Sequence, residues 1–240
     1  MIEQYDPLKI LFLDIETVPR VSSYDELSDK EAAFWDKKSA HFRSETETPA
    51  DVYPKAGIYA EFGKVICISV GLMTNKSSSL GFRVKSFYGD DEMTLLQNFS
   101  GMLEKFSEKQ GVYLCAHNGK EFDFPYIIRR LLINALPVPN LLNVSGKKPW
   151  EVPFLDTMEL WKFGDHKHYT SLDLLAFKFG ISTHKDDIDG SMVGKVYWED
   201  QDITRIVHYC EKDVITVAQL YQSYRGQHLI PQDNIEYVTD

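Results

Sequence analysis

Asp14 and Glu16 are the residues whose types and spacing most directly suggest chemistry in this 240-residue chain. They interrupt the apolar run 11–17 at positions two apart, and side chains two apart on a strand share one face. Neighbouring carboxylates on an apolar strand repel each other and lose solvation, and a divalent cation between them would remove that cost. Carboxylate oxygens suit Mg²⁺ or Mn²⁺. Because a strand-end Asp can simply cap the next turn, a metal site requires further carboxylates.

Asp123 is a second candidate ligand. It follows a buried strand predicted at 112–116 and a polar turn that contains Gly119. In open α/β sheets, binding sites gather beyond the carboxyl ends of the strands, and Asp123 is close to such an end. The alternative is that Asp123 is the N-cap of the following helix, where its side chain would satisfy free backbone amides.

Asp213 is a third candidate, on a helix predicted over 202–224. Tyr209 lies four residues earlier, so both side chains project from one partly apolar stripe beside the core face of the helix. An Asp that is half-buried without a basic neighbour at helical spacing needs a partner, and a metal ion would serve. The alternative is an ordinary Asp at the boundary between core and surface.

Together, these segments resemble the three exonuclease motifs of the DEDD superfamily of ribonuclease H-like 3′–5′ exonucleases. The first motif is Asp14-Ile15-Glu16, the second runs from Asn118 to Tyr126, and the third from Tyr209 to Asp213. The resemblance extends from about residue 8 to residue 225, in the order of the family. It is strongest to the proofreading exonuclease domain of family B DNA polymerases, especially to stand-alone relatives without a polymerase domain.

The resemblance implies an α/β, ribonuclease H-like fold with a mixed central sheet flanked by helices. It also implies two divalent cations, Mg²⁺ or Mn²⁺, and a tyrosine, Tyr209, that orients the attacking water. The expected metal ligands, which are also catalytic residues, are Asp14, Glu16, Asp123 and Asp213. The expected contacts to the substrate are Thr17, Asn118 and Phe122.

The reaction that the resemblance implies is metal-dependent hydrolysis of phosphodiester bonds from the 3′ end of single-stranded DNA, with release of 5′-mononucleotides. An exoribonuclease similar to ribonuclease D or oligoribonuclease is an alternative, because ribose selection depends on contacts that the sequence does not show. A non-catalytic nucleic-acid-binding module is a further alternative. All four carboxylates and the tyrosine are present, which favours an enzyme.

Two subclasses of these exonucleases differ in one residue: a Tyr four positions before the last Asp, or a His five before it. This chain has both Tyr209 and His208. Each residue turns a helix by about 100°, so Tyr209 lies about 40° from Asp213 around the axis and His208 about 140° away. This geometry and the proline of the second motif favour Tyr209.

The elements that position these residues begin with a strand at about 9–14. Hydrophobic periodicity and turn residues predict further strands and helices. The predicted strands are 64–73, 81–88 (after a turn at 77–79), 112–116 and 154–157, and the helices are 90–108, 123–135, 171–179 and 202–224. This order indicates a mixed sheet in one exonuclease domain, 1–240, with an insertion at about 20–60, partly helical near 29–40, and a short C-terminal tail from about 227.

The formal net charge of −10 argues against a broad duplex-binding surface, but permits an enzyme that holds one strand end through metals. Three basic groups could be solvated surface or phosphate contacts: Arg129-Arg130, Lys147-Lys148 and His166-Lys167-His168. Asp156, at a predicted strand end, is either structural or a support of the site. The acidic loop 186–190 lacks the spacing of an EF-hand and is interpreted as solvated.

No apolar run is long enough for a transmembrane helix, and the first residues lack the features of a signal peptide. The three cysteines, Cys67, Cys115 and Cys210, lack metal-type spacing and are interpreted as reduced core residues. We therefore expect a cytoplasmic protein that binds nucleic acid and no membrane. A polymerase domain does not fit in the remaining length, so any association with a polymerase would be in trans.

Overall fold

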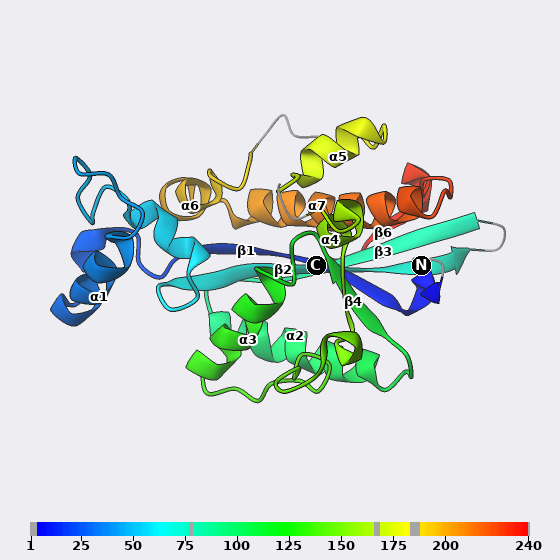
Figure 1. Cartoon of the computed structure of the whole chain (residues 1–240), viewed down its shortest axis with the longest axis horizontal. Coiled ribbons are helices and arrows are strands. Elements are labelled where there is room, and N and C mark those ends of the chain that lie inside the picture. Colours follow the sequence, from blue (N-terminus) through cyan, green and yellow to red (C-terminus); the bar gives the residue numbers. More distant parts are fainter. Residues whose placement is uncertain (1–3, 77–78, 166–168, 183–187, 240) are drawn as a thin grey trace.

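The computed structural model describes residues 4–76, 79–165, 169–182 and 188–239 (Figure 1). Parts of three sequence predictions lie outside these residues: the first two serines of the turn at 77–79, the basic group 166–168, and the first two residues of the acidic loop 186–190. Within the described part of the chain, no helix is long and apolar enough to cross a membrane.

A six-stranded mixed sheet forms the centre of the molecule, in the order β5-β4-β1-β2-β3-β6. Its strands are β1 (Ile10–Pro19), β2 (Gly63–Lys76), β3 (Ser79–Tyr88), β4 (Tyr113–Ala116), β5 (Phe154–Asp156) and β6 (Ile235–Tyr237). The first three are antiparallel neighbours, whereas β4 is parallel to β1 and β5 is parallel to β4. The sheet confirms the predicted α/β class and the ribonuclease H-like arrangement.

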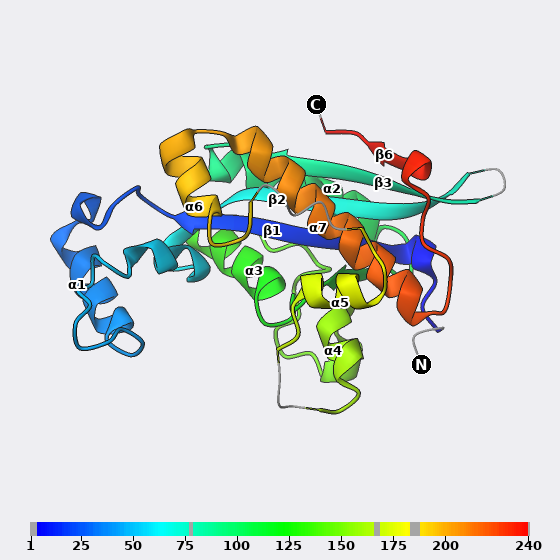
Figure 2. The same cartoon turned by 90° about the horizontal axis from the view of Figure 1, so that it is seen from above.

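Helices cover both faces of the sheet (Figures 1 and 2). One face packs on α2 (Glu92–Ser107) and α3 (Asp123–Ile133), and the other on the long helix α7 (Ile203–Tyr224). Strand alternation explains both contacts, because Leu11 and Leu13 join the core with α2 and α3, while Ile10 and Phe12 join the core with α7.

The strand β1 is longer than the sequence predicts, and its parallel neighbour is short. Only residues 10–12 of β1 pair with β4, which ends at Ala116, whereas β1 continues to Pro19 in contact with β2. Beyond Phe12, the β4 side of β1 therefore has no strand partner. This gap at the carboxyl end of β4 is where polar residues from other segments can approach β1.

The insertion forms a small structured unit at the end of β1, with the helix α1 (Asp29–Ser39) and a 3-10 segment, Tyr53–Ile58. It has its own aromatic core, in which Trp35 and Tyr53 are buried and lie edge-to-face. The Trp35 indole also donates a hydrogen bond of 2.8 Å to the carbonyl of Pro49. The helix predicted near 29–40 is confirmed.

The C-terminal residues add structure that the sequence analysis does not predict. The expected tail contains β6, which pairs in parallel with β3. The Gln219 side chain fixes the start of the tail, donating to the carbonyl of Ile230 and accepting from its amide, at 2.8 Å each. The short helices α4 (Thr157–Lys162) and α6 (Val193–Lys195) are also additional, whereas α5 (Leu172–Lys178) is predicted.

Candidate active site

Asp14 and Glu16 project from β1 toward α7. They continue the alternation of Ile10 and Phe12, so both carboxylates face the α7 side of the sheet. Asp14 is half-buried and Glu16 is buried. One ligand atom from each of Asp14, Glu16 and Cys210 lies within 4.8 Å of the others. The register of β1 against β2 shifts just after Glu16, and such bulges re-aim side chains near functional sites.

Asp123 meets this pair from the other side of the sheet. It is the first residue of α3, whereas the N-cap is Phe122, so the N-cap interpretation of Asp123 is wrong. The Asp123 Oδ1 atom instead accepts a hydrogen bond of 3.2 Å from the backbone N–H of Ile15. The amide of Ile15 lies beyond the residues that pair with β4, and the carboxylate of Asp123 serves as its acceptor.

The helix α7 supplies Tyr209 and Asp213, which are both half-buried and hydrogen-bonded to each other through their side chains. Burial raises the pKa of Asp14, Glu16 and Tyr209, and the charge of Asp213 raises each of them further. His208 has a side chain that is 65% exposed, with Nδ1 3.7 Å from the carboxylate of Glu211. The structure thus brings Tyr209, and not His208, to the carboxylates.

Burial and the repulsion between neighbouring negative charges raise the pKa of three carboxyl groups of the site. Burial raises the pKa of Asp14 well above its ordinary value, and the charges of Asp123 and Asp213 raise it further. Burial and the charge of Asp14 likewise raise the pKa of Glu16. Burial also raises the pKa of Asp123 to about 7, with the charge of Asp156 adding to the shift. Each carboxylate therefore becomes harder to ionise in the company of the others.

Divalent cations fit this donor set. Four carboxylates from three segments converge in a partly buried place, where each destabilises the anionic form of its neighbours. A cation would relieve that repulsion, and hard oxygen ligands are those that Mg²⁺ and Mn²⁺ prefer. Cys210 contributes differently, because its thiol donates to the carbonyl oxygen and to Oδ2 of Asp14, at 3.4 Å each. The thiol thereby orients the Asp14 carboxylate.

Asp156 organises the loop that carries Asn118. Its carboxylate accepts hydrogen bonds from the backbone amides of Asn118 and Lys120, at 2.9 and 3.1 Å. It also accepts from the amides of Met158 and Glu159 at the start of α4, at 2.9 and 3.3 Å. Asp156 is thus the N-cap of α4 and a structural support of the loop, while its support of the site itself stays a prediction. In the sequence, this structural role of Asp156 is indicated by its position directly at the end of an apolar strand.

Asn118 adopts a left-handed backbone conformation, with φ of 63°, which Asn tolerates better than most residues. Its Oδ1 atom is buried and has no hydrogen-bond partner among the described residues. Asn118 also lines a cleft of about 300 Å³, together with Lys120 and Lys162. The charged residues that line this cleft are mainly acidic, and Lys120 is ion-paired with Glu159. The unsatisfied Oδ1 atom is available to a hydrogen-bond donor of a ligand, and the predicted substrate role of Asn118 stays a prediction.

The other two predicted substrate contacts lie beside the same loop and strand. Thr17 is half-buried and hydrogen-bonded to the side chain of Tyr126 on α3. Phe122 is half-buried, and its ring centroid lies 5.4 Å from that of Tyr126. Both residues therefore have structural partners, and their roles as substrate contacts stay predictions.

Arg130 is neither a solvated surface residue nor a phosphate contact, which corrects both interpretations offered for it. Its guanidinium forms a buried, bidentate pair with Glu92, with N–O distances of 2.5 and 2.8 Å. Arg129 and Lys147-Lys148 are exposed, as a solvated surface requires. The three cysteines are buried and free. The contact between Cys210 and Asp14 has no signal in the sequence beyond a position inside the third motif.

Residues 58–230 match the family described as predicted 3′–5′ exonucleases related to the exonuclease domain of PolB. The match includes Asp123, Tyr209 and Asp213, whereas Asp14 and Glu16 precede it. No curated protein matches the chain.

Among solved structures, a family B DNA polymerase from the hyperthermophilic archaeon Pyrobaculum calidifontis matches with a TM-score of 0.49 and 15% identity. That match covers 91% of this chain, which spans only 27% of the polymerase.

Proposed function

Because the chain belongs to the family of predicted 3′–5′ exonucleases related to the exonuclease domain of PolB, we propose that it hydrolyses single-stranded DNA from the 3′ end. The reaction depends on Mg²⁺ or Mn²⁺ and releases 5′-mononucleotides. The observation that carries the proposal is the convergence of Asp14, Glu16, Asp123 and Asp213 from three separate segments. Four buried or half-buried carboxylates with no structural need for one another are costly unless they bind cations.

Each residue has a defined task in the proposed site. The four carboxylates hold two divalent cations, which when bound lower the pKa of the attacking water and stabilise the departing 3′ oxygen. The hydrogen bonds from Ile15 and Cys210 fix the carboxylates of Asp123 and Asp14 before any ligand arrives. This arrangement limits the reorganisation that binding requires.

Tyr209 orients the attacking water and does not deprotonate it. Burial, and next the charge of Asp213, raise the pKa of Tyr209 well above its ordinary value. The hydroxyl is therefore protonated at neutral pH and can donate a hydrogen bond as well as accept one. Its hydrogen bond to the Asp213 side chain, one helical turn away, holds the phenol beside the proposed ligands.

The substrate end is held by the loop that Asp156 organises. In the proposed complex, Oδ1 of Asn118 accepts a hydrogen bond from the terminal nucleotide. Phe122 offers an aromatic surface that tolerates any base. Contacts of this kind favour an enzyme without sequence preference.

A gel assay tests the proposal with 5′-labelled single-stranded DNA and RNA of the same sequence. The expected result is a stepwise ladder on DNA with Mg²⁺ or Mn²⁺, and none in EDTA. A ladder on RNA alone would instead support the exoribonuclease. If the folded protein cut neither DNA nor RNA with either metal, the exonuclease function would be refuted.

A further inference from the structure

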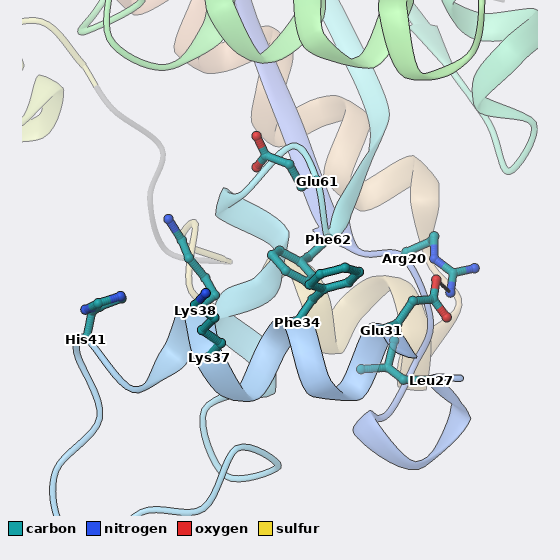
Figure 3. A pocket seen from close by; sticks show the side chains of 9 residues that line it. All are labelled: Arg20, Leu27, Glu31, Phe34, Lys37, Lys38, His41, Glu61 and Phe62. Carbon is teal, nitrogen blue, oxygen red and sulfur yellow. Dashed lines mark hydrogen bonds and ion pairs between the residues drawn. The ribbon is translucent and has the colours of Figure 1, made fainter. Parts of the chain in front are cut away.

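A cleft of about 570 Å³ lies between α1 and the segment that leads into β2, apart from the four carboxylates (Figure 3). Five of the side chains that line it are basic or aromatic and come from the end of β1 and from α1 and its vicinity. They are Arg20 just after β1, Phe34, Lys37 and Lys38 on α1, and His41 after the helix. None of these residues belongs to the three motifs.

The cleft has rigid walls. The aromatic core beneath α1 buries Trp35 completely, and the helix begins with a capping box between Ser28 and Glu31. Phe34, adjacent to Trp35, points the other way and is 56% exposed. In Figure 3 its ring lies in the middle of the lining, to which Phe62 also contributes. A large apolar ring that is held in place but not covered is suited to stack against a planar partner.

Two lysines of α1 lie outside its ion pairs, although Nζ of Lys38 lies 4.5 Å from the centroid of the Tyr59 ring. Glu31 pairs with Arg20 at 2.5 Å, and Asp36 pairs with Arg43 at 2.6 Å. Lys37 and Lys38 are exposed and form no ion pair among the described residues. With His41 neutral, the lining cations outnumber the carboxylates by one, in a chain whose net charge is −10. The cleft is thus a local exception to the acidic surface.

The cleft is connected to the proposed active site through β1 and through α3. Arg20 lies four residues after Glu16 along an extended strand, a distance of about 13 Å. The helix α3, which carries Asp123, also holds the wall of the cleft: Tyr126 donates to the carbonyl of Gly57 and Arg130 to that of Ala60. These hydrogen bonds, of 2.7 and 2.8 Å, fix the segment that continues into Glu61 and Phe62.

We infer that this cleft binds the single strand upstream of the scissile bond, an inference that rests on the proposed exonuclease function. A base stacks on Phe34, and the flanking phosphates pair with Lys37 and Lys38. Because Arg20 at the edge of the cleft lies about 13 Å along β1 from Glu16, the strand has to extend several nucleotides beyond the scissile bond to reach the cleft. A strand of only a few nucleotides therefore cannot occupy the cleft and the carboxylate site together.

The test combines binding and cleavage of a 5′-labelled 12-nucleotide oligothymidylate. Binding is measured in EDTA between 50 and 200 mM salt, and cleavage is followed on a ladder gel with Mn²⁺. The variants are Phe34→Ala and the double substitution Lys37→Glu/Lys38→Glu. The matched control is Lys105→Glu/Lys109→Glu, which makes the same charge change at exposed positions on and after α2.

The inference expects Phe34→Ala to weaken binding about five- to a hundredfold. The α1 double variant should bind at least about tenfold more weakly, and the slope of log affinity against log salt should fall by about 1.4, for two phosphate contacts. The wild-type protein should slow once the remaining strand is too short to reach the cleft, where its rate converges on that of the variants.

The inference would be overturned if both α1 variants showed the same affinity, the same salt slope and the same cleavage ladder as the wild-type protein. Equal losses in the control would also overturn it, because they would reflect net charge alone. Failure of the proposed function is distinguishable: a wild-type protein that binds through α1 but cuts no strand would refute the exonuclease and leave the cleft supported.

Discussion

The backbone N–H of Ile15 donates a hydrogen bond of 3.2 Å to Oδ1 of Asp123, across the gap where β4 has ended and β1 continues. One carboxylate oxygen therefore joins the first turn of α3 to the middle of β1. Asp14 and Glu16 flank Ile15 in the sequence. The same contact therefore sets the position of the second motif relative to these two carboxylates. The proposed site thus depends on an interruption of strand pairing.

Substitution of the site aspartates by asparagine should remove the negative charge of each side chain while keeping its shape and the fold of the protein. We expect Asp14→Asn, Asp123→Asn and Asp213→Asn each to lower the cleavage rate at least about a thousandfold, a barrier increase of about 4 kcal/mol. The Asp123→Asn side chain retains an oxygen for the amide of Ile15, so circular dichroism should stay unchanged. Asp233→Asn, at an exposed position near the C-terminal end of the chain, is the control. If one of the three site variants cleaves within threefold of the wild-type rate, the residue substituted in that variant does not belong to the site.

Tyr209 and His208 should respond differently to substitution. Tyr209→Phe removes only the hydroxyl beside Asp213, and the loss of one orienting group typically lowers kcat about 10²- to 10³-fold. His208→Ala should leave the rate unchanged, since that side chain is exposed and faces Glu211. Steady-state kinetics on single-stranded DNA measures both. The reverse pattern, with loss only in the His208 variant, would contradict the assignment.

Metal should stabilise the fold more strongly as pH rises. The pKa of Asp123 is about 7 in the folded chain, above its ordinary value of about 3.9. Its protonated form therefore contributes stability that is full below about pH 4 and is lost as pH rises through about 7. A cation reverses this loss by binding the ionised form.

The increase in Tm on adding Mn²⁺ to EDTA-treated protein should consequently grow between pH 5 and pH 8. Calorimetry at several pH values measures it, with Asp123→Asn as the variant in which the growth is diminished. An increase in Tm that is constant across this range would show that ionisation of the carboxylates is not linked to metal binding.

The buried pair of Arg130 and Glu92 should dominate local stability near the insertion. Arg130→Ala leaves the Glu92 carboxylate buried without its partner, which typically costs about 3–5 kcal/mol. Arg129→Ala, the exposed neighbour, should change stability by less than about 0.5 kcal/mol. Urea unfolding compares the two, and equal midpoints would show that the pair contributes nothing.

Local patterns were sufficient for most of the fold. The alternation around Asp14 and the periodicity around Asp213 predict β1 and α7, because each pattern is imposed by burial on one face. Contacts between distant segments were not predictable in this way. The strand β6 exists because it pairs with β3, and the burial of Arg130 depends on Glu92 on another helix.

The same limit applies to the site. Spacing within each motif identified the carboxylates as candidates, and their convergence now supports them. The hydrogen bond from Cys210 to Asp14, the acceptor role of Asp123 toward Ile15 and the exposure of Phe34 depend on the packing of three or more elements. No single segment encodes these relations, so periodicity and spacing do not reveal them.

Asp156 has a consequence for dynamics. Four backbone amides depend on its one carboxylate, two in the loop of Asn118 and two in the first turn of α4. Any fluctuation that withdraws the carboxylate exposes all four to solvent together, so they should exchange with deuterium as one cooperative unit. The amide of Met158 then becomes a reporter of order in a loop forty residues earlier, readable without substrate, metal or turnover.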